Sequence, residues 1–120
     1  MSRTMNHHKP RSTLTELCFV ADVAEGQARR VVVDNHAIAV FNVSGGYHVT
    51  DDTCTHGFSS LADGELDGCI VTCPWHGGSF DVTTGEAVGA PCSVPLVRYP
   101  CEVEDGRVRV DLNAPIVFGW

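Results

Sequence analysis

Two short segments with metal-binding side chains constrain this 120-residue chain more than any other feature. In the first, Cys54 and His56 are separated by one residue. Sixteen residues lie between His56 and the second segment, in which Cys73 and His76 are separated by two residues. Each segment supplies one thiolate and one imidazole from a single tight turn, and both groups are common metal ligands. The sequence therefore predicts that the two turns face each other across one metal centre.

Two kinds of centre use two thiolates and two imidazoles. A [2Fe–2S] cluster can be held by two Cys on one iron and two His on the other. Cys54 and Cys73 would then bind the inner iron, and His56 and His76 the outer iron. Tetrahedral zinc takes the same four ligands, which would make the chain a zinc-stabilised interaction module. A Cys-x-His pair is unusual in zinc fingers, and the surrounding chain has a β pattern, so the sequence favours the iron–sulfur cluster.

The composition fits a single domain in the cytoplasm. Hydrophobic residues make up 43% of the chain and charged residues 19%, a balance typical of soluble globular proteins. No stretch approaches the roughly 18 apolar residues of a membrane helix, and residues 1–13 lack the apolar segment of a secretory signal. We therefore expect a chain that does not enter the membrane.

In a reducing compartment, metal binding is a better explanation than disulfides for paired cysteines. The six cysteines are Cys18, Cys54, Cys69, Cys73, Cys92 and Cys101. We expect Cys18 and Cys101 to be small buried residues in strands. Cys69 and Cys92 flank the metal motif, and the sequence favours a structural role for them over a place beside the metal.

The pattern of apolar residues predicts β-strands almost throughout and no amphipathic helix. Asp34-Asn35 and Asp105-Gly106 are hairpin signals between such strands. The segment 53–91 is richer in glycine than the rest, as expected for loops that bend closely around a centre. The expected strands are residues 14–20, 28–33, 37–43, 47–50, 66–68 and 69–72 (which form a hairpin), 79–82, 96–104 and 107–112.

This pattern suggests three regions along the chain, one of which contains a subdomain. Residues 1–12 form a flexible N-terminal arm, and residues 13–112 form the metal-binding domain. Within that domain, a subdomain of about residues 53–91 carries the two ligand turns. Residues 113–120 form a C-terminal tail.

The charge of the chain is −7 at pH 7, and it is unevenly distributed. Residues 51–86, which contain the metal motif, hold seven acidic residues and no Lys or Arg. The lack of a basic surface excludes nucleic acid as an expected partner. A partner protein with a basic docking surface is favoured instead, because complementary charge steers association.

The four ligands and their neighbours resemble the Rieske family. Further matching residues are Gly57, Pro74, Gly77, Asp81, Gly85 and the segment Gly89-Ala90-Pro91, which resembles a proline loop that shields the cluster. The resemblance implies one [2Fe–2S] cluster and an all-β Rieske fold. That fold is an antiparallel sandwich or barrel-like body with a cluster-binding subdomain of two loops.

Four positions depart from the respiratory members of that family. Ser59 and Trp75 stand where those relatives carry two disulfide-bonded cysteines, so that disulfide cannot form here. Gly78 and Phe80 stand where those relatives carry hydroxyl groups that donate hydrogen bonds to the cluster. Fewer donors stabilise the reduced state less. We therefore expect a potential near the low end of the Rieske range, which runs from about −150 to +300 mV.

The chain is most similar to the small ferredoxin of bacterial aromatic-ring-hydroxylating dioxygenase systems. The resemblance implies that it carries single electrons from an NAD(P)H-dependent flavin reductase to a terminal oxygenase, without catalysing a reaction itself. A monomer is the default expectation for its oligomeric state. His56 and His76 would form the electron exit, with Trp75 and Phe58 as candidate partner contacts. A small Rieske-like subunit of another oxidoreductase, such as a nitrite reductase, is the alternative.

Overall fold

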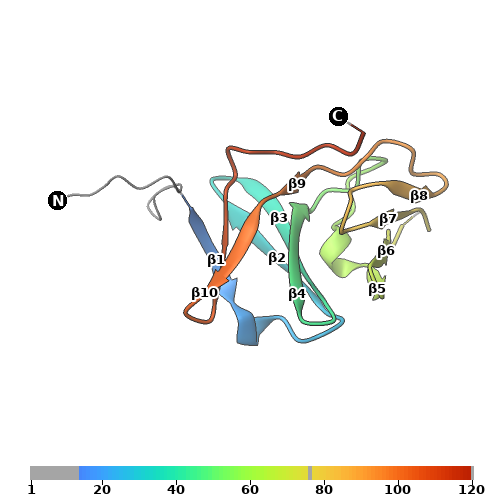
Figure 1. Ribbon diagram of the computed structural model, residues 1–120. Coiled ribbons are helices and arrows are strands. Elements are labelled where there is room, and N and C mark those ends of the chain that lie inside the picture. Colours follow the sequence, from blue (N-terminus) through green and yellow to red (C-terminus); the bar gives the residue numbers. More distant parts are fainter. Residues whose placement is uncertain (1–13, 76, 120) are drawn as a thin grey trace.

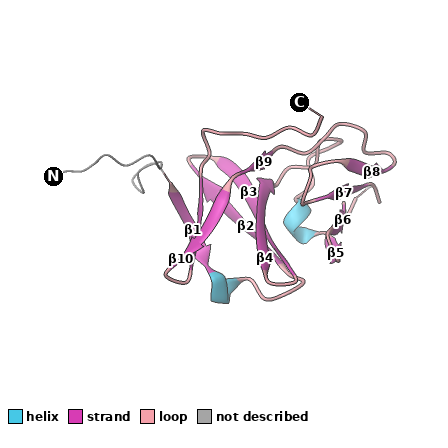
Figure 2. Ribbon diagram, in the orientation of Figure 1, coloured by secondary structure: helices cyan, strands magenta, loops and turns pink. Residues whose placement is uncertain are grey.

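The computed structural model describes residues 14–75 and 77–119 of the chain. Those residues form β-strands joined by loops and two single-turn 3₁₀ helices, η2 (Val20–Asp22) and η3 (Leu61–Asp63) (Figure 2). The strands are β1 (Thr15–Phe19), β2 (Ala28–Val33), β3 (His36–Val43), β4 (Gly46–Asp51), β5 (Glu65–Asp67), β6 (Ile70–Thr72), β7 (Ser79–Asp81), β8 (Ala87–Gly89), β9 (Arg98–Tyr99), β10 (Cys101–Glu104) and β11 (Arg107–Val110).

The strands form three antiparallel sheets. A three-stranded sheet has the order β1-β11-β10, and a four-stranded sheet has the order β2-β3-β4-β9. Together these two sheets make up the body on the left of Figure 1, and the third sheet, β5-β6-β7-β8, stands beside it on the right. This all-β architecture confirms the fold class expected from the sequence. No helix of the described residues has the length and apolar character needed to cross a bilayer.

Tight turns set the register of the body strands. Asp34 and Asn35, between β2 and β3, have φ angles of 49° and 68°. Asp105 and Gly106, between β10 and β11, have φ angles of 54° and 74°. Two successive positive φ angles are the mark of a type I′ turn, whose twist matches that of the flanking strands. Both hairpins were expected from these residue pairs.

Strand β3 contributes to two separate cores. Ile38 and Val40 pack in the body core, whereas Ala39 and Phe41 pack in the core beneath the metal motif. All four side chains are fully buried. Successive side chains of a strand point to opposite faces, so one strand covered on both faces joins the body to the cluster-binding sheet.

The structure departs from the expected strands at two places. The single strand expected over 96–104 is wrong, because β9 pairs with β4 and β10 pairs with β11 in the other sheet. Pro100 lies between them, and proline has no N–H to continue a ladder. Strand β8 was not anticipated. In the tail, Ile116 pairs with Arg98 through two backbone hydrogen bonds of 2.9 and 2.8 Å.

Candidate metal centre

The first ligand turn lies between β4 and η3 and carries Cys54. The Cys54 amide donates to the Ser59 carbonyl at 3.0 Å, and the Gly57 amide donates to the Cys54 carbonyl at 3.2 Å. An isolated bridge between Thr53 and Ser60 closes the base of the turn. These backbone bonds fold residues 54–59 into one compact loop, which leaves His56 exposed at its tip.

The second ligand turn joins β6 to β7 and carries Cys73. The Cys73 amide donates to the Gly78 carbonyl at 2.7 Å, and the Gly77 amide donates to the Cys73 carbonyl at 3.1 Å. Gly77 has a φ of 73°, which favours glycine. The turn thus resembles the first in its construction, with the cysteine at its start held by two backbone bonds.

A third loop, residues 90–95, runs against the first turn. The Thr55 hydroxyl donates to the Val94 carbonyl at 2.8 Å. Cys92, in the same loop, has its sulfur 3.8 Å from the sulfur of Cys54. Cys92 is buried, and it packs in the same core cluster as Cys54 and Cys73. Cys92 is thus a buried core residue, in line with the structural role favoured for it, and it also contacts a predicted ligand.

Burial divides the predicted ligands into two kinds. Cys54 and Cys73 are only 2% and 1% exposed, whereas His56 is exposed. His76 lies outside the described residues. Among residues 14–75 and 77–119 no three Cys, His, Asp or Glu side chains are arranged to hold a metal ion, so the ligand set stays a prediction. Two buried thiols below an exposed imidazole fit a cluster with its cysteine iron inside and its histidine iron outside.

A hydroxyl contacts one of the predicted ligand sulfurs. Ser59 Oγ lies 2.9 Å from Cys73 Sγ, and Ser59 is buried. The sequence showed only that Ser59 replaces a disulfide-bonded cysteine of the respiratory relatives. Gly78 and Phe80 do lack hydroxyls, but the inference that the site is poor in donors overlooked Ser59. Ser59 and Cys73 are 14 positions apart in the chain, and no local pattern in the sequence marks the contact.

The pKa of the Cys92 thiol is raised to about 12, first by burial and then by its hydrogen bond to Cys54. Burial also raises the pKa of Cys18 and Cys101. Both lie in body strands, as expected, although Cys101 is only partly buried. The Cys101 thiol donates to the Tyr47 carbonyl at 3.2 Å, far along the chain from the ligand turns.

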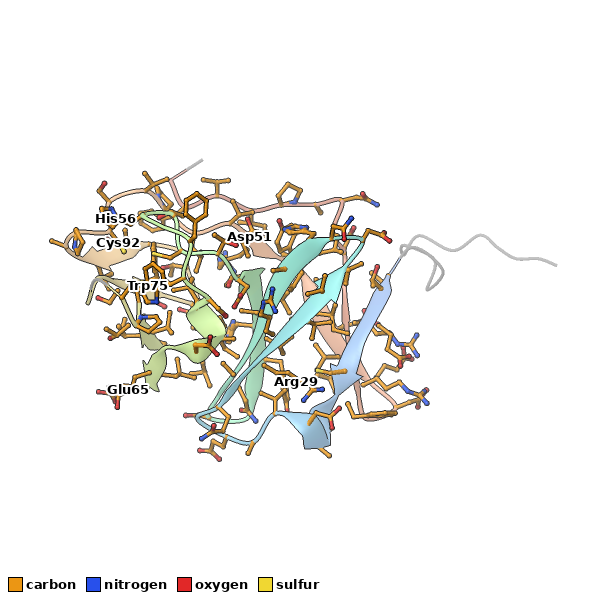
Figure 3. All side chains as sticks on the ribbon, turned by 180° about the vertical axis from the view of Figure 1, so that it is seen from behind. Arg29, Asp51, His56, Glu65, Trp75 and Cys92 are labelled. Carbon is orange, nitrogen blue, oxygen red and sulfur yellow. The ribbon has the colours of Figure 1, made fainter. Side chains whose placement is uncertain are left out.

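Two aromatic side chains stand out into solvent near the ligand turns. Phe58, two residues after His56, is 94% exposed, and Trp75, two residues after Cys73, is 72% exposed. Figure 3 shows His56, Trp75 and Cys92 at one end of the molecule, away from Arg29 of the body. Large exposed apolar side chains beside a candidate site are typical of interaction surfaces.

Comparison with known proteins agrees with this geometry. The protein-family model of the Rieske [2Fe-2S] domain matches residues 13–100. The ferredoxin component of the p-cumate 2,3-dioxygenase system of Pseudomonas putida is 48% identical over 103 residues, which cover 84% of this chain and 87% of that protein.

Two solved structures share the fold at high sequence identity. The Sphingomonas yanoikuyae B1 ferredoxin superposes with a TM-score of 0.77 at 48% identity, over 80% of this chain and 95% of that one. A ferredoxin solved in complex with the oxygenase of carbazole 1,9a-dioxygenase superposes with a TM-score of 0.78 at 42% identity, over 82% of this chain and 93% of that one. The resemblance drawn from the motif is confirmed: this chain belongs to the Rieske [2Fe-2S] family.

Proposed function

We propose that this protein is the electron-carrying ferredoxin of a bacterial aromatic-ring dioxygenase system. The observation that carries the proposal is the pair of buried cysteines, Cys54 and Cys73, beside an exposed histidine in a Rieske domain. Ferredoxin components of such systems, including that for p-cumate, are similar over most of the chain. The bound [2Fe–2S] cluster supplies reversible one-electron chemistry, and the protein itself performs no substrate oxidation.

The four predicted ligands divide the work between interior and surface. Cys54 and Cys73 would hold the inner iron, and both are buried. His56 and His76 would hold the outer iron, and a ring nitrogen that is not bound to metal could donate a hydrogen bond to a partner group. His56 is exposed, as an exit for electrons requires.

The partners are a flavin reductase that oxidises NAD(P)H and a terminal oxygenase. Both dock transiently on the end that carries the ligand turns, with Phe58 and Trp75 as apolar contacts. The monomer meets them in the cytoplasm. A related ferredoxin in complex with the oxygenase of carbazole 1,9a-dioxygenase supports this choice of partner class. The 72% exposure of Trp75 supports its role as a partner contact.

The test is reconstitution with a dioxygenase reductase, an oxygenase and NADH. The purified protein should be brown and contain two irons and two sulfides, and its dithionite-reduced form should give the EPR spectrum of mixed Cys and His ligation. Trp75→Ala should slow electron transfer to the oxygenase and leave that spectrum unchanged. A colourless protein that holds zinc, or a loaded protein that cannot support oxygenation with any such system, would refute the proposal.

A further inference from the structure

Each predicted ligand sulfur is in contact with a buried side chain that can donate a hydrogen bond. Ser59 Oγ lies 2.9 Å from Cys73 Sγ, and Cys92 Sγ lies 3.8 Å from Cys54 Sγ. Ser59 is 4% exposed and Cys92 is 5% exposed. Water has little access to these positions, so protein groups must supply the hydrogen bonds that solvent would otherwise provide.

Gly78 leaves the space that Cys92 occupies. A Cβ atom at residue 78 would overlap the Cys92 sulfur and would come within 3.0 Å of the Cys92 backbone nitrogen. Gly78 is itself buried, and its carbonyl accepts a hydrogen bond from the Cys73 amide. A side chain at residue 78 and the thiol of Cys92 therefore compete for one place beside the ligand turns, and in this chain the thiol fills it.

We infer that Ser59 and Cys92 raise the reduction potential of this protein by donating O–H···S and S–H···S hydrogen bonds to Cys73 and Cys54. A hydrogen bond to a thiolate stabilises its negative charge. The reduced cluster is the more negative state, so donors to the ligand sulfurs favour reduction. The inference rests on the proposed function, because it requires Cys54 and Cys73 to hold the cluster.

Ser59→Ala tests the first donor, with Ser60→Ala as its matched control. The Ser60 hydroxyl is buried in the neighbouring position and has no hydrogen-bond partner among the described residues. Ser59→Ala should lower the equilibrium constant for reduction by about three- to tenfold, where tenfold is about 59 mV for one electron. Ser60→Ala should leave the potential unchanged. Redox titration followed by visible absorbance measures both.

A second pair of variants separates the hydroxyl from the shape of the side chain. Ser59→Thr keeps a hydroxyl, whereas Ser59→Val has nearly the same shape and lacks one. The Thr variant should keep a potential close to that of the parent, and the Val variant should show the same fall as Ser59→Ala. Unchanged EPR g-values would show that the ligands are intact in each loaded variant.

Cys92 is tested together with Gly78. Cys92→Ala should lower the potential, whereas Cys92→Ser should not, because it keeps a donor. Gly78→Ser alone should impair cluster loading, since its Cβ meets the Cys92 sulfur. Loading should recover in part when Cys92→Ala is added, because the sulfur is removed while the Cys92 backbone nitrogen stays 3.0 Å away; a double-mutant cycle measures this coupling.

The outcomes distinguish this inference from the proposed function. A parent protein without iron and sulfide would contradict the function itself. A loaded parent whose potential equals that of Ser59→Ala and Cys92→Ala would overturn the inference and leave the function standing. Equal potentials for loaded Ser59→Thr and Ser59→Val would overturn the role of the Ser59 hydroxyl even if Ser59→Ala failed to load.

Discussion

Individual residues of the metal motif could be predicted because their spacing is local. One residue between Cys54 and His56, or two between Cys73 and His76, confines each pair to a single turn whatever the rest of the chain does. The contact between Cys54 and Cys92 spans 38 residues and depends on how the 90–95 loop crosses the first turn. Such contacts are properties of the tertiary structure, and neither composition nor periodicity indicated them.

At this scale, the ligand role of Cys54 leads to a prediction. Cys54→Ala should abolish the visible absorbance and the bound iron, because the cluster would lose one of its four predicted ligands. Cys101→Ala is the control, since the Cys101 thiol bonds the Tyr47 carbonyl in the body, and it should keep full iron content. Iron analysis of both proteins decides the matter. A Cys54→Ala protein that binds the full amount of iron would show that another residue is the ligand.

Strands were predicted well where their boundaries are marked by turn residues, and poorly elsewhere. The Asp34-Asn35 and Asp105-Gly106 turns fixed two hairpins. The break at Pro100 could not be predicted from the flanking residues, which all favour strands. The two strands are distinguished by their neighbours, because β9 pairs with β4 and β10 pairs with β11. Strand β8 has only three residues, Ala87–Gly89, and pairing with β7 defines it more than its own sequence does.

The two-faced strand β3 leads to a prediction about stability. Phe41 is fully buried in the core beneath the ligand turns. Phe41→Ala should lower the free energy of unfolding by about 3–5 kcal/mol. Val32→Ala on β2 is the control, because Val32 is 53% exposed, and it should change that energy by less than about 0.5 kcal/mol. Urea unfolding followed by circular dichroism measures both, and equal effects would contradict this packing.

The turn after β7 leads to a prediction about pH. The Asp81 carboxylate accepts from the Thr83 amide at 2.9 Å and from the Thr83 hydroxyl at 2.6 Å. Burial raises its pKa, but these hydrogen bonds outweigh burial and leave the pKa below its ordinary value. The stabilisation is therefore present above the unfolded pKa of about 3.9 and is lost as the pH falls through the folded pKa.

Asp81→Asn should accordingly lower the free energy of unfolding at pH 7 by about 1 kcal/mol. The difference between the two proteins should shrink as the pH falls below about 4. Unfolding by urea at a series of pH values gives both quantities. A difference that is constant down to the lowest pH would show that the charge of Asp81 contributes nothing.

Across the whole molecule, the acidic segment 51–86 divides into internal and external charges. Asp52 is buried and pairs with Arg30 at 3.3 Å. Asp51 accepts hydrogen bonds from Tyr99 at 2.7 Å and contacts His36 at 2.6 Å. Both carboxylates therefore make contacts within the domain. The exposed ones are Asp63, Glu65, Asp67 and Glu86, and Figure 3 shows Glu65 at the edge of the cluster-binding sheet, on the same side as Trp75.

Only the exposed carboxylates are free to steer a basic partner. The rate of electron transfer to the oxygenase should fall as salt is added, because screening acts over about 10 Å at 0.1 M. Glu65→Gln combined with Asp67→Asn should slow transfer at low salt and flatten the salt dependence. Glu102→Gln on β10, exposed in the body, is the control. Stopped-flow rates of the parent protein that do not change with ionic strength would contradict electrostatic steering by these carboxylates.

The backbone bonds that close the two ligand turns have a kinetic consequence. Cys54 and Cys73 are each tied at both amide and carbonyl, and both side chains are buried. Loops held in this way have little freedom to move when the charge beside them changes by one electron. The nuclear rearrangement that accompanies each transfer is therefore small, so an electron can enter and leave quickly even when donor and acceptor differ little in potential.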